Sequence, residues 1–427
     1  MTPNSIAFIE PGPNLVQFLA AVGERLAPTH RAVFFSTRVK SRSLLRRLGQ
    51  EVLPQSVSAR TAKPALELDT EALLARLRKT GDRALVERQS PALFQLAGKI
   101  DAFLDQVEPA GIFLWNGSGL TAAIADQLAS RRGIPRLFAE NGYLPNTLQI
   151  DPEGVNAFAS IGRELDLDEI RAQIYSQDQI QEFEILLADY RGGRPPRRSP
   201  PPGGRVRPSP LAYLIQAWND WGERDARIQA NRLIPREIPS LPERFVFFPL
   251  QVRSDSQLTI HSPIYANRLD QAIADVRAAL SRVAPQLRLV VKLHPADLDK
   301  TDYDPLAESY PDLIWVGGGD VRPLLQRAEC VVTVNSTVGI EGLIFDTPVV
   351  TLGNNFYVRQ GLVHPVTERD QLASRLTQAL TQPPDRELIQ QYLRYLYFHA
   401  FVRAHWRDYS PASLDNLAQR IQRMVEG

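Results

Sequence analysis

An apolar run in the second half of the chain ends in a group of polar side chains. The segment PLQVRSDSQ, residues 249–257, places an amide, a guanidinium and a carboxylate close together, at Gln251, Arg253 and Asp255. Asp255 could act as a nucleophile or a base, and Gln251 could hold it or the substrate by hydrogen bonds. In the alternative interpretation the segment is a polar loop in which Asp255 caps the next turn.

A second polar group, Lys292-Leu293-His294-Pro295, follows a run of Leu and Val. Lys292 and His294 alternate with Leu293, so their side chains can lie on one face of a strand. Two donors on one face could bind a phosphate or a carboxylate. The alternative is a single His that ends a strand and binds no ligand.

A third group, residues 335–342, lies between an expected strand and an expected helix. The hydroxyls of Ser336 and Thr337, with the free N–H groups of the helix start, predict an anion site. Gly339 would let a ligand approach the backbone closely. Glu341 lies four residues after Thr337, which misses the three-residue spacing of a capping box, so we expect it to bond ribose hydroxyls.

The first half of the chain contains two more polar segments, which end successive expected strands. They are Trp115-Asn116-Gly117-Ser118-Gly119 and Glu140-Asn141-Gly142-Tyr143. We expect Asn116, Asn141 and Tyr143 to contact a second substrate, and Glu140 to act as a base. A turn alone also explains Asn116-Gly117, because Asn-Gly is a common turn pair.

The elements that must position these residues alternate between strands and helices. In the first half we predict strands at 5–9, 32–36, 111–115 and 136–139, and helices at 14–26, 41–48, 69–87, 91–107 and 120–131. In the second half we predict strands at 244–249, 287–293, 313–316, 330–334 and 348–352, and helices at 265–283, 321–327, 338–345, 385–406 and 413–425. This alternation is typical of an α/β protein with parallel sheets covered on both faces. We therefore expect two doubly wound Rossmann-type domains that face each other across a ligand cleft.

These elements divide the chain into four parts. They are a Rossmann-like domain at 1–190, a linker and connecting helix at 191–240, a second Rossmann-like domain at 241–384, and C-terminal helices at 385–427. Residues 191–210 hold six Arg, seven Pro, four Gly and no acid, a composition that cannot build a core. We predict a linker or a disordered insertion there. It is either solvated or in contact with anionic lipid headgroups.

Charge and composition exclude several classes of protein. With 49 Lys and Arg against 48 Asp and Glu, the net charge of +1 creates no global field for nucleic acid. Cys330 is the only cysteine, so there is no internal disulfide and no Cys-rich zinc site. The start of the chain does not read as a signal peptide, and no apolar run is long enough to span a bilayer. We expect a cytoplasmic protein.

Neither a Gly-x-Gly-x-x-Gly nor a Walker A sequence occurs, which disfavours dinucleotide oxidoreductases and P-loop kinases.

Taken together, these segments resemble the capsule polysaccharide biosynthesis family, the bacterial retaining β-Kdo (3-deoxy-manno-octulosonate) glycosyltransferases. The resemblance rests on PLQVRSDSQ with its Gln-x3-Asp, on KLHP, on NSTVGIEGLIFDTPVVTLGNNFY (335–357), and on WNG (115–117) with ENGYLPNTLQIDPEGVNA (140–157). These segments occur in order over roughly residues 110–365. The first hundred residues and the Arg/Pro segment do not contribute to the resemblance.

The resemblance implies a GT-B fold, with an acceptor domain first and a nucleotide-sugar domain second. It also implies CMP-Kdo as donor and retention of the β configuration. In this family the Asp of Gln-x3-Asp is the expected catalytic carboxylate, which corresponds to Asp255 with Gln251 beside it. His294, Ser336, Thr337 and Glu341 correspond to residues expected around CMP. Arg253 fills a variable position of the motif, and we group it with Lys292 and Gly339 in donor binding.

A chemical argument agrees with these assignments. The phosphate and the sugar carboxylate of CMP-Kdo need clustered donors, which Lys292, His294 and the Ser336-Thr337 turn could supply. Because CMP is a good leaving group and no Asp-x-Asp ends a strand, we expect no metal and no other cofactor. The acceptor would be lipid- or saccharide-linked, at the inner face of the cytoplasmic membrane.

Three other functions compete with this one. The first is a GT-B enzyme that uses another nucleotide sugar or a CDP-polyol. The second is a non-catalytic, nucleotide-sugar-binding subunit of a capsule export assembly. The third is nucleic-acid binding through the Arg/Pro segment, which the absence of a basic face elsewhere argues against.

Overall fold

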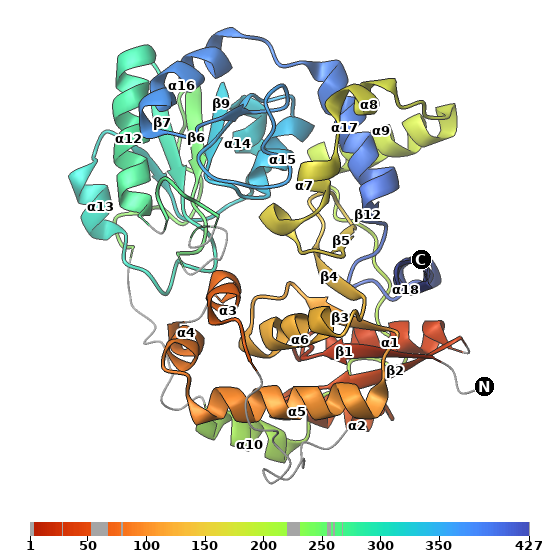
Figure 1. Ribbon diagram of the computed structural model, residues 1–427. Coiled ribbons are helices and arrows are strands. Elements are labelled where there is room, and N and C mark those ends of the chain that lie inside the picture. The colour runs from red at the N-terminus through yellow and green to blue at the C-terminus, as the bar shows by residue number, and fades with distance from the viewer. Residues whose placement is uncertain are drawn as a thin grey trace.

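The computed structural model describes residues 4–27, 29–52, 67–77, 80–219, 231–253, 258, 261–266 and 268–426. These residues form two six-stranded sheets, each covered by helices, and Figure 1 shows them as two separate layers of the molecule. The architecture is that of two facing Rossmann-type domains, so the α/β, GT-B-like fold expected from the sequence is confirmed.

The strand order of the first sheet is β12-β5-β4-β3-β1-β2. Its strands are β1 Asn4–Ile9, β2 His30–Phe35, β3 Gly111–Trp115, β4 Arg136–Asn141, β5 Leu148–Asp151 and β12 Phe401–Val402. The first four pair in parallel, whereas β5 is antiparallel to β4 and to β12. Alternate residues of β1 enter different cores, with Ile6 and Phe8 on one face and Ala7 and Ile9 on the other. The near-continuous apolar run of β1 follows from this burial on both faces.

The strand order of the second sheet is β11-β10-β9-β6-β7-β8, and all of its pairs are parallel. Its strands are β6 Phe245–Pro249, β7 Arg288–Lys292, β8 Ile314–Val316, β9 Cys330–Thr333, β10 Val349–Thr351 and β11 His364–Pro365. Because β6 lies between β7 and β9, the loops that follow these three strands leave the same edge of the sheet.

Helices cover both faces of each sheet (Figure 1). Those in the first half are α1 Val16–Leu26, α2 Val39–Arg47, α3 Thr70–Arg76, α4 Thr80–Glu87, α5 Pro91–Val107, α6 Leu120–Arg131, α7 Ile161–Glu164, α8 Leu167–Ala172, α9 Gln177–Arg191 and α10 Pro210–Asn219. Those in the second half are α12 Leu269–Val283, α13 Asp304–Ser309, α14 Arg322–Arg327, α15 Val338–Ile344, α16 Leu372–Thr381, α17 Arg386–Tyr395 and α18 Pro411–Glu426. Short 3₁₀ turns lie at Asn156–Phe158 and Arg369–Gln371, and a π-turn lies at Leu396–Ala400. Among the described residues, no helix has the length and apolar character that crossing a membrane requires.

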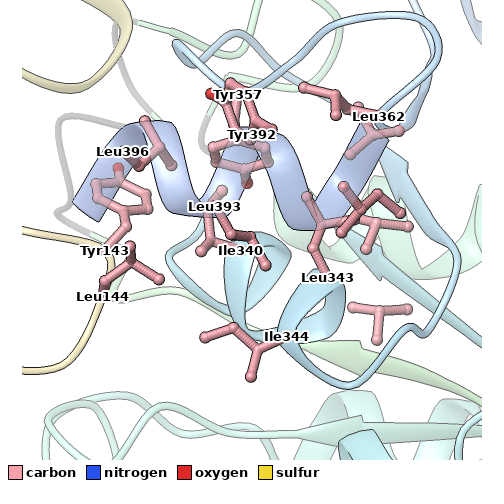
Figure 2. Close-up of a cluster of buried hydrophobic side chains, with 14 of the residues drawn as sticks. Tyr143, Leu144, Ile340, Leu343, Ile344, Tyr357, Leu362, Tyr392, Leu393 and Leu396 are labelled. Carbon is pink, nitrogen blue, oxygen red and sulfur yellow. The ribbon is translucent and has the colours of Figure 1, made fainter. Parts of the chain in front are cut away.

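One hydrophobic cluster joins the two halves of the molecule. It contains Tyr143 and Leu144 from the first half, Leu343 and Ile344 from α15, and Tyr392 from α17. Figure 2 shows α17 lying across these side chains. Beyond α17 the chain returns to the first domain, where β12 extends the first sheet and α18 packs on α1. The domains therefore share a core as well as two crossings of the chain.

The C-terminal part differs from the expectation. The predicted helix at 385–406 ends at Tyr395, and the chain continues as a π-turn and the strand β12. The predicted helix at 69–87 is two helices, α3 and α4. The first sheet is also not wholly parallel, because β5 is antiparallel to β4 and β12 is antiparallel to β5, which lies far away in sequence. Local patterns cannot predict such a two-residue strand.

The Arg/Pro segment runs from α9 to α10 along the first domain. Arg198 Nε donates to Asn146 Oδ1 at 2.9 Å, and the Ser199 N–H donates to Asp408 Oδ1 at 2.9 Å. Further along, the Val206 N–H donates to Gln17 Oε1 at 3.1 Å. Most of its side chains are exposed.

Candidate active site

The loop after β6 and the loop after β9 are joined by a reciprocal pair of amides. Gln251 Nε2 donates to Asn335 Oδ1 at 3.0 Å, and the Asn335 backbone N–H donates to Gln251 Oε1 at 3.2 Å. Both side chains are buried. The structure thus brings the Gln-x3-Asp segment and the Ser/Thr turn together at one sheet edge. Asp255 itself lies outside the described residues.

The amide pair continues as a hydrogen-bonded chain into the first domain. Asn355 Nδ2 donates to the Asn335 carbonyl at 2.8 Å and to Tyr143 Oη at 2.7 Å. Tyr143 Oη donates to Asn156 Oδ1 at 2.7 Å. The polar atoms of this chain are neutral and its members are buried, so both domains are tied together without the desolvation cost of a buried charge.

This place for Tyr143 differs from the expected one. Its side chain is 6% exposed and its ring packs edge-on against Phe356, 4.8 Å between centroids. A side chain so enclosed is not presented to an acceptor in this structure. Tyr143 instead connects the domains, and its sequence neighbours alone do not reveal this.

The loops after β6 and β7 are also tied together. The Arg253 N–H donates to Asp297 Oδ2 at 2.9 Å, and the guanidinium of Arg253 lies 5.2 Å from the centre of the Tyr303 ring. Tyr303 Oη donates to the same carboxylate oxygen at 3.2 Å, and burial raises the pKa of Tyr303 to about 12. The Asp297 N–H in turn donates to the His294 carbonyl at 2.9 Å. Asp297 therefore positions both predicted donor-binding loops, a role that the sequence did not suggest.

His294 and Lys292 have different surroundings. His294 is exposed, and its Nδ1 accepts the Ala296 N–H at 3.1 Å, so the neutral ring carries its hydrogen on Nε2 as a donor. Lys292 is buried, and burial lowers the pKa of its ammonium, opposed by the charge of Asp320. The structure therefore gives the two residues separate environments, although they alternate along the chain.

Glu341 belongs to a charged cluster beside Lys292. Burial raises its pKa, and its carboxylate accepts a hydrogen bond from the Tyr190 hydroxyl of α9. Its Oε2 atom is buried and has no hydrogen-bond partner among the described residues. Asp320 lies near both Glu341 and Lys292 and binds Arg322, with Nη2 at 2.6 Å from Oδ2. Asp320, Arg322 and Tyr190 were not recognised from the sequence, because the first two lie at or just before the start of α14 and Tyr190 lies in a helix of the other half.

Gly339 of the Ser/Thr turn is needed for a different reason than the one expected. A Cβ on Gly339 would lie 2.7 Å from Cζ of Tyr357, so the aromatic ring fills the space that we reserved for a ligand. Tyr357 Oη donates to the Ser336 carbonyl at 2.6 Å, which fixes the turn. Ser336 is half-buried and Thr337 is exposed, so the Thr337 hydroxyl remains accessible.

In the first domain the structure brings Asn116, Glu140 and Asn141 together at the carboxyl ends of β3 and β4. Glu140 Oε2 accepts from Asn116 Nδ2 at 3.2 Å, and Oε1 accepts the Asn141 N–H at 2.8 Å. Asn116 Oδ1 accepts the Ser118 N–H at 3.1 Å, with Asn116 and Gly117 in the left-handed region. The Asn-Gly turn therefore exists, and it also holds the carboxylate of Glu140.

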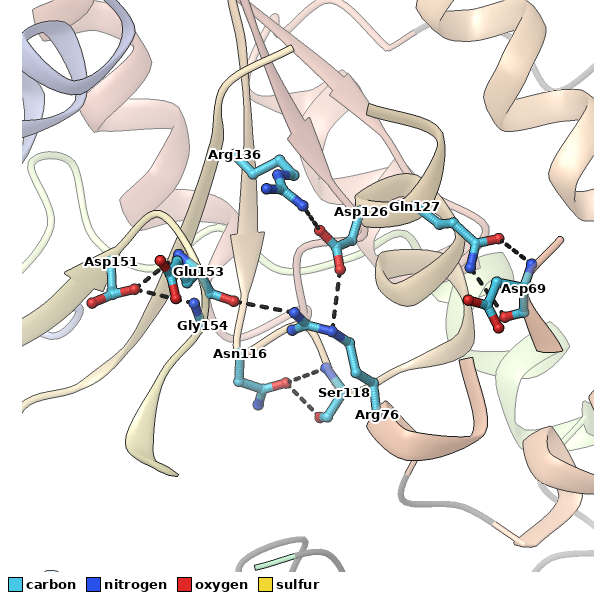
Figure 3. A network of polar contacts seen from close by, with 10 residues as sticks. All are labelled: Asp69, Arg76, Asn116, Ser118, Asp126, Gln127, Arg136, Asp151, Glu153 and Gly154. Carbon is cyan, nitrogen blue, oxygen red and sulfur yellow. Dashed lines mark hydrogen bonds and ion pairs between the residues drawn. The ribbon is translucent and has the colours of Figure 1, made fainter. Parts of the chain in front are cut away.

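An arginine that the sequence did not single out lies near this turn. Figure 3 shows Arg76 of α3 between Asp126 and the Glu153 carbonyl, at 3.2 Å and 3.1 Å. Its guanidinium also lies 5.1 Å from the centre of the Phe158 ring. Phe158 in turn packs edge-on against His261 of the second domain, with 4.3 Å between ring centres. Arg76 and Phe158 thus connect Asp126 of the first domain to the loop that follows the Gln-x3-Asp segment.

A pocket of about 500 Å³ opens beside Asn116 at the carboxyl edge of the first sheet. Glu10 and Arg38 line it, and neither was recognised from the sequence. Glu10 Oε2 accepts the Thr37 N–H at 2.8 Å, and its Oε1 lies 3.3 Å from Arg38 Nε. A carboxylate directly after the first strand, in IEPGP, was the available signal. Among the described residues, no three His, Cys, Asp or Glu side chains gather in a way that could hold a metal ion.

Residues 216–406 match a family model described as "Capsule polysaccharide biosynthesis protein". This match covers less than half of the chain, and over these residues the chain is similar to the family. The resemblance predicted from the motifs is thereby confirmed, whereas the Kdo donor stays a prediction.

Two curated relatives extend the match. The chain is 29% identical over 316 residues to Protein FixF of Sinorhizobium fredii, covering 73% of this chain and 63% of the relative. It is 28% identical over 258 residues to the capsule polysaccharide export protein KpsS of Escherichia coli, covering 56% of this chain and 66% of the relative. The matched part thus spans just under two thirds of the length of each relative.

A solved structure of Thermosulfurimonas dismutans KpsC, beta Kdo 2,7 transferase, is similar over 99% of both chains, with 12% identity and a TM-score of 0.46. At this level of similarity we draw no argument from it.

Proposed function

We propose that this protein is a glycosyltransferase of capsule or surface polysaccharide biosynthesis that transfers β-Kdo from CMP-Kdo with retention of configuration. The observation that carries the proposal is the reciprocal amide pair of Gln251 and Asn335. This pair joins Gln251, four residues before Asp255, to Asn335, the residue before the Ser/Thr turn. The family resemblance assigns the nucleophile to the first segment and nucleotide binding to the second.

The proposed donor site uses side chains at the edge of the second sheet. His294 offers its Nε2–H to the phosphate, and Thr337 offers a hydroxyl from the turn after β9. Lys292 and the Glu341 carboxylate are buried behind this edge, and the exposed Asp320 lies near both of them. Among the described residues the Lys292 ammonium forms no salt bridge, so we expect its charge to add to the positive potential that a doubly anionic donor needs.

The proposed chemistry is a double displacement. The Asp255 carboxylate attacks the anomeric carbon, and the bond from that carbon to the CMP oxygen breaks with its electron pair leaving on CMP. Glu140 then takes the proton of an acceptor hydroxyl, whose oxygen attacks the same carbon and displaces Asp255. Two inversions give net retention. Asn116 and Asn141 hold the Glu140 carboxylate ready for this second step.

We propose further that the reaction needs no metal, because CMP leaves as a stable anion, and that the acceptor is lipid- or saccharide-linked at the inner face of the cytoplasmic membrane. The pocket beside Asn116 and Arg38 offers room for part of that acceptor.

The test is transfer from CMP-Kdo, generated in the assay, to a soluble Kdo-containing acceptor, with the product anomer read by NMR. Asp255→Asn should lower turnover by about a thousandfold or more and change CMP affinity by less than about threefold. Asp299→Asn is the matched control, because Asp299 is exposed and pairs with Arg236. Near-normal turnover by Asp255→Asn would exclude the proposed nucleophile.

A second candidate function is a non-catalytic nucleotide-sugar-binding subunit of an export assembly. The similarity to KpsS, a capsule polysaccharide export protein, favours it. A GT-B enzyme for another nucleotide sugar or a CDP-polyol is the remaining alternative. Thermal stabilisation by CMP, CDP, UDP and GDP separates them, since a ligand that binds the native state raises its melting temperature. CMP alone should stabilise the protein. CMP binding without turnover would favour the subunit, and a response to UDP or GDP alone would exclude Kdo transfer.

A further inference from the structure

The helix α10 exposes an apolar surface. We define the α10 face as Leu211, Tyr213, Leu214 and Ile215, which are 65%, 47%, 68% and 39% exposed. Leu211, Leu214 and Ile215 are spaced i, i+3 and i+4, so they share one side of the helix, whereas Ala212 is buried. Scattered exposed apolar residues are ordinary, but a stripe of them on one helix marks an interaction site.

Basic side chains border the α10 face. The neighbouring helix α2 carries Lys40, Arg42, Arg46 and Arg47 and has no acidic residue. The two helices are joined, because the Ser209 N–H donates to Ser43 Oγ at 2.9 Å. Figure 1 shows α10 and α2 at the end of the first domain that lies away from the second sheet.

The basic border continues on both sides of this junction. Lys40 Nζ lies 4.9 Å from the centre of the Tyr213 ring. Arg46 and Arg47 are exposed, as are Arg205 and Arg207, which lead into α10. An apolar stripe with a basic border is the pattern of a helix that lies in a membrane interface.

We propose that the α10 face and α2 together dock this protein on an anionic lipid bilayer. Leu211, Leu214 and Ile215 enter the boundary between headgroups and acyl chains, and the basic residues of α2 lie over the headgroup phosphates. The positive charge is local, since the whole chain has a net charge of only +1. This favours a surface of fixed negative charge over the apolar face of another protein.

The same surface adjoins the pocket of the first domain. α2 begins at Val39, directly after Arg38, which lines that pocket. Docking through α10 and α2 would therefore bring the pocket close to the lipid surface. The proposal goes beyond the transferase assignment and does not rest on it, because vesicle binding is measured without turnover.

The test is co-sedimentation of the full chain with phosphatidylglycerol/phosphatidylcholine vesicles and with pure phosphatidylcholine vesicles. We expect binding to the anionic vesicles that weakens with salt, and little binding to the neutral ones. Changing Leu211, Leu214 and Ile215 together to Ser should lower the partition coefficient by about tenfold or more, since a shallowly inserted apolar stripe supplies much of the binding. Ile174→Ser with Ile185→Ser is the matched control, because these two residues are exposed by 91% and 55% elsewhere.

The charges have a matched control as well. Arg46→Ser with Arg47→Ser should weaken binding by roughly fivefold per charge. Arg197→Ser with Arg198→Ser removes the same charge near Asn146 and should have the smaller effect. If the two double variants lost binding equally, or the triple Ser variant bound like the native chain, the proposed surface would be wrong. Loss of a dimer in the triple Ser variant, with no vesicle binding by the native chain, would assign the face to a second copy.

A second measurement does not depend on loss of binding. Leu214→Trp places a fluorophore in the α10 face, and brominated lipids should quench it on anionic vesicles. A tryptophan at position 174, made by Ile174→Trp, should not be quenched. Equal quenching of both would exclude insertion through α10.

Discussion

Removing the Tyr143 hydroxyl tests the hydrogen-bonded chain between the domains. In Tyr143→Phe the ring remains, so its packing on Phe356 is kept and no cavity opens. Asn156 Oδ1 loses the donor at 2.7 Å, and Asn355 Nδ2 loses the acceptor at 2.7 Å but keeps the Asn335 carbonyl at 2.8 Å. One buried acceptor and one buried N–H without a partner cost about 1–3 kcal/mol each. Because the Asn355 amide keeps one bond, we expect a total loss of about 2–4 kcal/mol in the free energy of unfolding.

The assay is urea unfolding followed by circular dichroism, with Tyr213→Phe as the control. The Tyr213 ring is 47% exposed, so loss of its hydroxyl should change stability by less than about 0.5 kcal/mol. A double-mutant cycle with Asn355→Ala should give a coupling of about 1–2 kcal/mol between the residues. Equal stability of Tyr143→Phe and Tyr213→Phe, or a coupling near zero, would refute the argument that this chain ties the domains together.

Three further predictions concern single side chains. Gly339→Ala should lower the free energy of unfolding by about 1–3 kcal/mol, because the new Cβ overlaps the buried Tyr357 ring. The measurement is urea unfolding. The control is Gly119→Ala, because the space around Gly119 is open. Burial raises the pKa of Glu341, so the folded chain binds the Glu341 proton more tightly than the unfolded chain does, and native stability should fall as pH rises above 4.5. Glu341→Gln should lessen this fall. Parallel stability–pH profiles of the native chain and the variant would contradict this prediction. Burial, with Arg198 and Arg407 nearby, lowers the pKa of His405 to about 4, so native stability should be lost as pH falls from 6.5 towards 4. His405→Gln should reduce that loss. Melting temperatures measured across this pH range check the prediction.

Most strands could be predicted because they are short apolar runs between polar segments. β1, β3 and β6 are buried on both faces, so their successive residues are mostly apolar, such as Ile, Phe and Val. The strands β5 and β12 could not be predicted. β5 is a four-residue strand, LQID, that contains a Gln and an Asp, and β12 has two residues. β5 is a strand because it pairs with β4 and β12, and β12 is a strand because it pairs with β5.

The candidate site was predicted in part. Asn116 and Glu140 meet as expected, because β3 and β4 are neighbouring parallel strands and their carboxyl ends share an edge. Glu10 and Arg38 were missed, although they follow β1 and β2, because a single carboxylate after a strand is a weak signal. Asp297 was missed since its role is to bind the backbone of another loop.

The sequence by itself determined the two sheets, the segments that end at their carboxyl edges, and the resemblance to the capsule polysaccharide biosynthesis family. It could do so because apolar periodicity and loop composition are local properties of the chain. Only the tertiary structure decided what the polar side chains of these segments contact. Gln251 pairs with Asn335, Tyr143 pairs with Asn355, and Glu341 meets Tyr190 of the other half. Hydrogen bonds and burial depend on which groups the fold brings within about 3 Å, and no local pattern contains that information.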